Sequence, residues 1–213
     1  MSADPTLRLH LFFAKDNDRA VILRQGPSKL FRMILWYRDS DRFEDGQWLK
    51  HKVYVDRCSL SPDGKHFLFF ALDGKWGSAA KGSYTAISQP PYFTALVLHP
   101  QGDTWGGGGA FISNTRYVVD GCDAKNVMDH STGLKRVQRK EPSPLSLQIP
   151  DAEALREAHL QQIANLGYRT EGACLYRRAD NSLIRDFTDM SFEPIKAPYD
   201  MRSGWHPADR DLT

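Results

Sequence analysis

The sequence has few cysteines, no long apolar segment and no marked excess of charge of either sign. Its three cysteines, Cys58, Cys122 and Cys174, are widely spaced. An odd, sparse set of this kind argues against a disulfide framework and fits a reducing compartment. No stretch approaches the roughly 18–20 apolar residues that cross a bilayer, and the polar start lacks the pattern of a secretory signal. We therefore expect a cytoplasmic protein with no membrane partner.

The charges nearly cancel, with 28 lysines and arginines against 26 acids, a formal net charge of +2. The densest cationic run, residues 135–140, holds four cations, but the C-terminal half around it is close to neutral. A nucleic-acid-binding protein would carry a broad positive field, so we expect no nucleic acid partner. The run precedes two prolines and predicts a solvated loop, in which Arg136 and Arg139 are candidate contacts for an acidic protein.

Short apolar runs rich in aromatic and β-branched residues fill the first part of the chain, and turn residues separate them. These features predict a series of short strands. The helical crossovers that a parallel α/β fold requires are missing before residue 150. The sequence therefore predicts a mainly β protein. The predicted strands before residue 120 are 7–14, 20–23, 30–37, 53–60, 66–72, 92–98 and 110–119.

One helix is predicted, near residues 151–166. Asp151 can cap it, its apolar residues recur at three- and four-residue spacing, and Gly167 marks its end. Strand character resumes at 173–178 and 183–187. From Glu193 the chain is rich in proline, so we expect the tail 193–213 to be extended and irregular. The whole chain, residues 1–213, is expected to form a single β-rich domain.

A weak repeat of 38 residues aligns Ser61-Pro62-Asp63-Gly64 with His99-Pro100-Gln101-Gly102. The stretch 58–70 around the first of these turns resembles the strand-turn-strand core of β-propeller blades of the tryptophan-aspartate and TolB-like types. The resemblance implies a small propeller-like fold of about five short blades, in which the helix is an insertion. The Gly-His and Trp-Asp signature of the first type is missing. The alternative folds are a β-sandwich or an α+β arrangement, in which 61–64 is an ordinary hairpin turn.

Four consecutive glycines follow Trp105, and such a run permits a close backbone approach. A phosphate-binding loop would need a lysine and a hydroxyl residue after the glycines, and neither is present. Trp105 and Trp76 both lie beside glycines in predicted loops, where a large aromatic side chain can stay exposed and bind a partner. A structural role for these two residues is the alternative. Trp36 and Trp48 lie in or near predicted strands and are expected to pack between sheets.

No motif specifies a chemistry. Asp16-Asn17-Asp18 lacks the glycine and glutamate of a calcium loop, and the group of Cys122, Asp123, Asp129 and His130 lacks zinc spacing. We therefore expect neither a metal nor another cofactor.

The preferred interpretation is a non-catalytic protein-interaction module, a subunit or regulator of a larger assembly. Its binding residues would be Trp76, Trp105, Arg136 and Arg139. The alternative is a carbohydrate-binding or glycoside-processing propeller, whose ligand is a glycan or another small molecule. A glycoside-processing enzyme would use a pair of carboxylates. The candidates for that pair are Asp16, Asp18, Asp63, Asp103 and Glu193.

Overall fold

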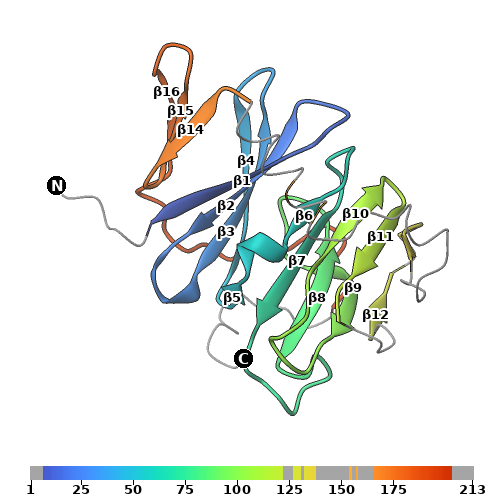
Figure 1. Ribbon diagram of the computed structural model, residues 1–213. Helices are drawn as coiled ribbons and strands as arrows, with labels where there is room; N and C mark the ends of the chain where they lie inside the picture. Colours follow the sequence, from blue (N-terminus) through green and yellow to red (C-terminus); the bar gives the residue numbers. More distant parts are fainter. Residues whose placement is uncertain are drawn as a thin grey trace.

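The computed structural model describes residues 7–121, 127–130, 132–137, 154, 157 and 166–202. Within these residues the chain forms sixteen strands in four sheets, which we name A to D, together with two 3-10 turns (Figure 1). The prediction of a mainly β protein is confirmed.

The sheets begin one after another along the chain, and one strand of sheet B, at residues 128–129, follows the first two strands of sheet C. Sheet A is a four-stranded antiparallel meander. Its strands are β1 (Arg8–Phe13), β2 (Arg19–Gln25), β3 (Phe31–Tyr37) and β4 (Arg42–Leu49), with the turn η1 (Pro27–Lys29) between β2 and β3. Sheet B has the order β12-β9-β8-β7-β5, and β6 also pairs with β7. Its strands are β5 (Lys52–Val53), β6 (Ser59–Leu60), β7 (Phe67–Leu72), β8 (Ser83–Ser88), β9 (Ala95–Pro100) and β12 (Met128–Asp129), with the turn η2 (Val55–Arg57) between β5 and β6.

Sheets C and D have three strands each. Sheet C consists of β10 (Gly109–Ser113), β11 (Arg116–Val119) and β13 (Lys135–Arg136), and sheet D of β14 (Tyr168–Glu171), β15 (Cys174–Arg177) and β16 (Leu183–Asp186).

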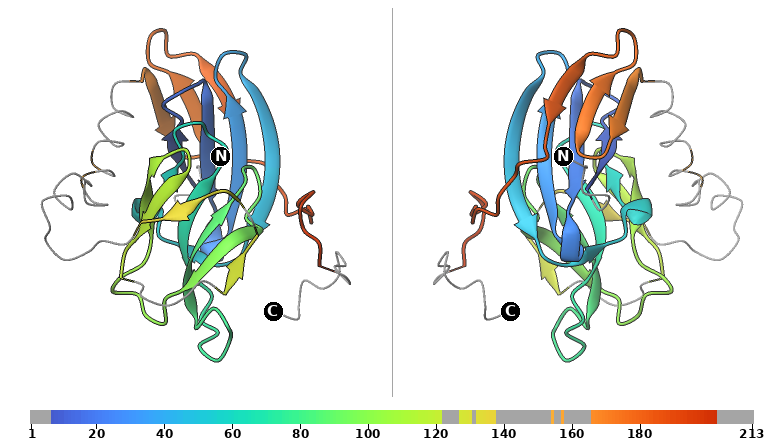
Figure 2. Two further views of the ribbon diagram at one scale, coloured as in Figure 1. Left: turned by 90° about the vertical axis from the view of Figure 1, so that its right-hand side faces the viewer. Right: turned by 90° about the vertical axis from the view of Figure 1, so that its left-hand side faces the viewer.

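The sheets pack face to face in the order D, A, B, C, and an apolar layer fills each of the three spaces between them (Figures 1 and 2). Sheet A is apolar on both faces because side chains alternate along a strand. Leu23 and Met33 face sheet B, whereas Ile22 and Ile34 face sheet D. Two buried faces explain why β2 and β3 are almost continuously apolar, which is unusual for an antiparallel sheet.

Two finer predictions about the fold have different outcomes. Among the described residues no apolar layer joins sheets C and D, so the four sheets do not close into a ring of five blades. The predicted helix at 151–166 lies outside the described residues, apart from Ala154, Glu157 and Leu166.

Several strand boundaries also differ from prediction. The run 53–60 is interrupted by η2, and the run 110–119 is a hairpin that turns at Asn114 and Thr115. Strands β4, β8 and β14 were not predicted, because polar residues interrupt the apolar residues in their sequences and no continuous apolar run marks them. The turn at 61–64 forms as its residues require: Gly64 has a φ of +69°, and Asp63 accepts hydrogen bonds from Ser61 and Lys65.

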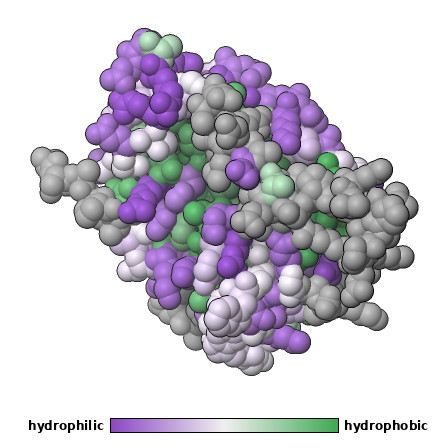
Figure 3. Space-filling view, in the orientation of Figure 1, coloured by the Kyte–Doolittle hydropathy of each residue, from purple (hydrophilic) through white to green (hydrophobic). Residues whose placement is uncertain are grey.

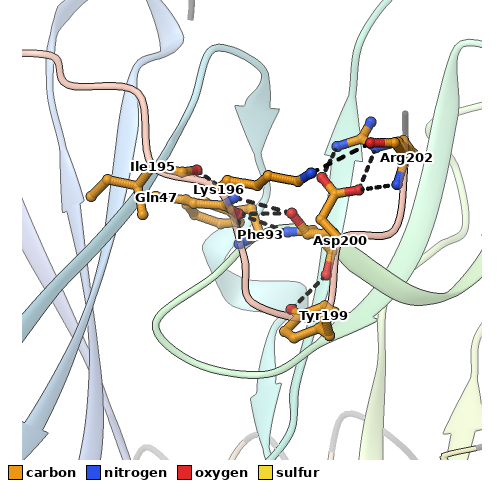
Figure 4. Close-up of polar contacts among 8 residues, drawn as sticks. Gln47, Phe93, Ile195, Lys196, Tyr199, Asp200 and Arg202 are labelled. Carbon is orange, nitrogen blue, oxygen red and sulfur yellow. Dashed lines mark hydrogen bonds and ion pairs between the residues drawn. The ribbon is translucent and has the colours of Figure 1, made fainter. Parts of the chain in front are cut away.

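After sheet D the chain crosses sheet A toward sheet B, and its described part, 187–202, contains neither helix nor strand. Gln47 of β4 is the centre of this contact (Figure 4). Its side-chain oxygen accepts the backbone N–H groups of Phe93 and Thr94, and its amide nitrogen donates to the Ile195 carbonyl at 2.7 Å. The Tyr199 hydroxyl donates to the Thr94 carbonyl at 2.8 Å. These bonds satisfy buried polar groups on both sides of the contact and fix the tail against two sheets.

Candidate functional site: two tryptophan loops

Two loops leave the same end of sheet B. The β7–β8 loop covers residues 73–82, and the β9–β10 loop covers residues 101–108. Strands β7 and β9 both pair antiparallel with β8, so they run in the same direction and their C-terminal ends lie at the same edge of the sheet, on either side of the start of β8. Figure 1 shows this end at the bottom of the molecule. The first loop carries Trp76 and the second carries Trp105.

Hydrogen bonds join the β9–β10 loop to Ser83, the first residue of β8, which directly follows the β7–β8 loop. The Gln101 N–H donates to the Ser83 carbonyl at 2.8 Å, and the Ser83 hydroxyl donates to the Asp103 carbonyl at 2.5 Å. Farther out, a Cβ placed on Gly102 would lie 3.8 Å from the side chain of Lys81, so these two residues are neighbours. The loops therefore form one surface.

Trp105 is exposed on a backbone that is held in place. Its side chain is 94% exposed. The Asp103 carboxylate accepts the N–H groups of Trp105 and Gly106, at 2.9 and 3.3 Å. The Arg57 guanidinium donates to the Thr104 carbonyl at 3.1 Å and to the Gly106 carbonyl at 2.5 Å. Full burial of so large an aromatic side chain would stabilise the fold by about 2–3 kcal/mol. Because Trp105 is exposed, the folded protein gains almost none of this stabilisation from it.

Trp76 is 56% exposed and rests on its own loop. One face of its ring covers Gly82, which has a φ of +78°, so close that an added Cβ would overlap the indole. The Asp73 carboxylate accepts the Lys75 N–H at 2.9 Å, and the Trp76 N–H donates to the Gly74 carbonyl at 3.1 Å. The exposed remainder of this indole is available to a partner.

The glycine run after Trp105 is explained by packing. An added Cβ on Gly107 would overlap the Phe70 ring, on Gly108 it would lie 2.5 Å from the Arg57 side chain, and on Gly109 it would overlap the Val118 carbonyl. Because it has no side chains, the run lets sheet C approach sheet B and places Arg57 under the loop.

The two predicted basic residues are not part of these loops. Arg136 is half-buried on β13, where it pairs with Tyr117 of β11. Arg139 lies outside the described residues. The structure thus brings Trp76 and Trp105 together and places Arg136 on another element. Trp36 is fully buried between sheets A and D, and Trp48 lies under the guanidinium groups of Arg24 and Arg32.

A buried histidine–tyrosine pair between sheets B and C was not predicted. His99 Nε2 lies 3.0 Å from the Tyr117 hydroxyl, and both residues are almost completely buried. Burial and the nearby positive charge of Arg136 lower the pKa of His99 to about 4, against the smaller opposite effect of Asp129. Burial raises the pKa of Tyr117 to about 12. Both groups are therefore neutral near pH 7, and they are enclosed rather than open to a substrate. No sequence signal marks the pair, because the two residues lie on strands of different sheets.

The carboxylates of the alternative interpretation all have polar partners. The Asp16 carboxylate accepts a hydrogen bond from the Asn114 side chain, and the Asp63 carboxylate accepts the Ser61 hydroxyl and the Lys65 N–H. Asp103 caps the β9–β10 loop. The remaining two form ion pairs, Asp18 with Arg38 and Glu193 with Arg32.

In the part of the chain that the structure describes, no group of three or more His, Cys, Asp or Glu side chains could hold a metal ion. The described helical segments include none with the length and apolar character to span a membrane. Comparison of the chain with protein-family models, with curated proteins and with solved structures finds no match.

Proposed function

We propose that the protein is a non-catalytic interaction module that binds another protein through Trp76 and Trp105, as a subunit or regulator of a larger assembly. One observation carries the proposal: the side chain of Trp105 is 94% exposed while the backbone on both sides of it is fixed by Asp103 and Arg57. A residue whose backbone is already fixed loses less entropy when it binds, and tryptophan is enriched among residues that dominate binding energies.

The stack of sheets supports the proposal by giving the loops a rigid base. Sheets A, B and C pack face to face in the order in which they begin along the chain, as blades do, while sheet D packs on the other face of sheet A. We propose that the fold is a propeller-like arrangement of this kind. Loops at one end of such a stack form a continuous surface, while the apolar layers beneath them hold the strands fixed.

Affinity purification from the native cells tests the function, with three forms of the tagged protein compared side by side. We expect a protein partner to co-purify in stoichiometric amount with the wild type and to be lost with Trp105→Ala. Leu183→Ala is the matched control, since Leu183 is a 53% exposed apolar residue of sheet D. Both substitutions should change the free energy of unfolding by less than about 0.5 kcal/mol. Recovery of the wild type alone, or equal recovery of a partner with all three forms, would contradict the proposal.

A further inference from the structure

We infer that the partner presents an acidic segment to the end of the molecule that carries Trp76 and Trp105; this inference rests on the proposed function and specifies the chemistry of the partner. Three observations support it: the placement of the exposed lysines, the strained backbone of two of them, and the hydrogen bonds that direct the neighbouring carboxylates to backbone N–H groups.

Exposed lysines continue from the tryptophan loops to sheet A. Lys52 pairs with Leu72, the last residue of β7, and thus lies directly beside the start of the β7–β8 loop. Lys52 also lines a groove of about 420 Å³, whose other walls are the β2–β3 connection and Val53. The exposed lysines of this end are Lys29, Lys50, Lys52, Lys75 and Lys81. Figure 3 shows the lower part of the molecule as mainly white and purple, with most green atoms of this view above it.

Lys81 stands between the two loops in a strained conformation. Its φ is +55°, a region that residues with a Cβ enter at a cost of roughly 1–2 kcal/mol. The Lys81 N–H donates to the Ser78 carbonyl at 2.9 Å, and its side chain lies beside Gly102 of the other loop. The fold therefore keeps a cation at the junction of the loops, where glycine would relieve the strain. Lys29, on the wall of the groove, has a φ of +62°. Strained residues of this kind are concentrated at functional sites.

The acids of the two loops do not cancel this charge at the surface. Asp73 and Asp103 direct carboxylate oxygens to the N–H groups of their own loops, as described above, and both are only partly exposed. Asp56 of η2 and Asp120 after β11 are the other described acids near the β9–β10 loop. Within the two loops, the exposed side chains of Lys75 and Lys81 thus stand against two acids, Asp73 and Asp103, that both direct carboxylate oxygens to backbone N–H groups. A segment that combines carboxylates with apolar side chains complements both the lysines and the indoles.

A nucleic acid strand fits this end less well. Strand binding requires a cationic groove that follows successive phosphates, in addition to stacking aromatic side chains. Arg57, beside the β9–β10 loop, donates to the Thr104 and Gly106 carbonyls and lies over the rings of Tyr54 and Phe70. The lysines are spread over three connections rather than aligned along one groove.

Selection from a displayed library of random 12-residue peptides tests the inference. We expect the wild-type protein to enrich peptides that carry several Asp or Glu residues around an aliphatic or aromatic residue. Synthetic copies of the enriched peptides should bind the double variant Lys75→Gln/Lys81→Gln about tenfold more weakly, because two surface ion pairs are lost. Lys15→Gln, which removes an exposed lysine from the β1–β2 loop, is the matched control and should leave the affinity unchanged.

The outcomes separate this inference from the proposed function. Enriched peptides that depend on Trp105 but carry no acidic residues would overturn the acidic segment and leave the interaction module standing. Failure to enrich any peptide that depends on Trp105 would overturn both. A (dT)20 oligonucleotide serves as the third probe, and binding of it in preference to the acidic peptides, with loss in Trp105→Ala, would overturn the choice of a protein partner.

Discussion

The Ser83 hydroxyl donates a 2.5 Å hydrogen bond to the Asp103 carbonyl, and this bond ties the β9–β10 loop to the first residue of β8, which directly follows the β7–β8 loop. Ser83 is completely buried at the start of β8, whereas Asp103 lies two residues before the exposed Trp105. A small buried side chain thus links the core of sheet B to the candidate binding surface.

Ser83→Ala should loosen the β9–β10 loop. The substitution removes one buried hydrogen bond and leaves the Asp103 carbonyl without its donor, so we expect the free energy of unfolding to fall by about 1 kcal/mol. Amide hydrogen exchange should quicken within residues 101–108 more than in β1 or β2. Ser40→Ala, at an exposed position before β4, should change neither quantity. Equal exchange in both variants would contradict the role given to Ser83.

The glycine run permits a direct test of close packing. Gly107→Ala introduces a Cβ into the Phe70 ring at a φ of +94°, and we expect a loss of about 2–4 kcal/mol in the free energy of unfolding from backbone strain and overpacking together. Gly74→Ala is the matched control, because Gly74 has a φ of +76° and nothing within 4 Å of the added Cβ. It should cost only the backbone term, about 1–2 kcal/mol. Urea denaturation of the two variants measures the difference, and equal losses would refute the packing explanation.

Gln47 should control the attachment of the C-terminal tail. Gln47→Ala leaves the N–H groups of Phe93 and Thr94 and the carbonyl of Ile195 without their partner. We expect a loss of about 2–4 kcal/mol in stability and faster proteolysis at Lys196 and Arg202. The control is Gln89→Ala, since Gln89 is exposed and uses its backbone N–H for the bond to Tyr199. Unchanged cleavage in Gln47→Ala would show that other contacts hold the tail.

The buried His99 predicts a pH dependence of stability. The folded protein lowers the pKa of His99 from its ordinary 6.5 to about 4, so between these values the unfolded chain binds more protons. The free energy of unfolding should therefore decrease as the pH falls from 6.5 toward 4. Burial lowers the pKa of His10, His51 and His66 as well, and their contributions have the same sign.

His99→Gln should make this dependence of the free energy of unfolding on pH shallower. Chemical denaturation at a series of pH values gives the slope for each form. Identical slopes for the wild type and His99→Gln would contradict the assignment.

The sequence predicted the β class and many of the strands because apolar runs such as 20–23 and 67–70 belong to sheets that are buried on both faces. It predicted no strand at β4, where Arg42, Glu44 and Asp45 interrupt the apolar pattern. Arg42 and Glu44 form an ion pair with each other within the strand, whereas Asp45 forms one with Arg185 of β16, which is remote in sequence. Polar residues satisfied by tertiary contacts give no local signal.

The candidate site was predicted in part. The glycines beside Trp76 and Trp105 correctly indicated loops with exposed indoles, but the proximity of the two loops depends on the order of strands in sheet B. Lys81 was not singled out, since neither its positive φ nor its place beside Gly102 can be read from the chain. Arg136 stood out in a basic run, yet in the structure it lies in a strand against Tyr117.

Photo-crosslinking in the native cells tests the central claim most directly. Benzoylphenylalanine is placed at position 76, 105 or, as the control, 183, and the crosslinked products are identified by mass spectrometry. The account predicts that positions 76 and 105 crosslink to the same protein and that position 183 does not. Crosslinks of equal yield from all three positions, or none from 76 and 105, would contradict it.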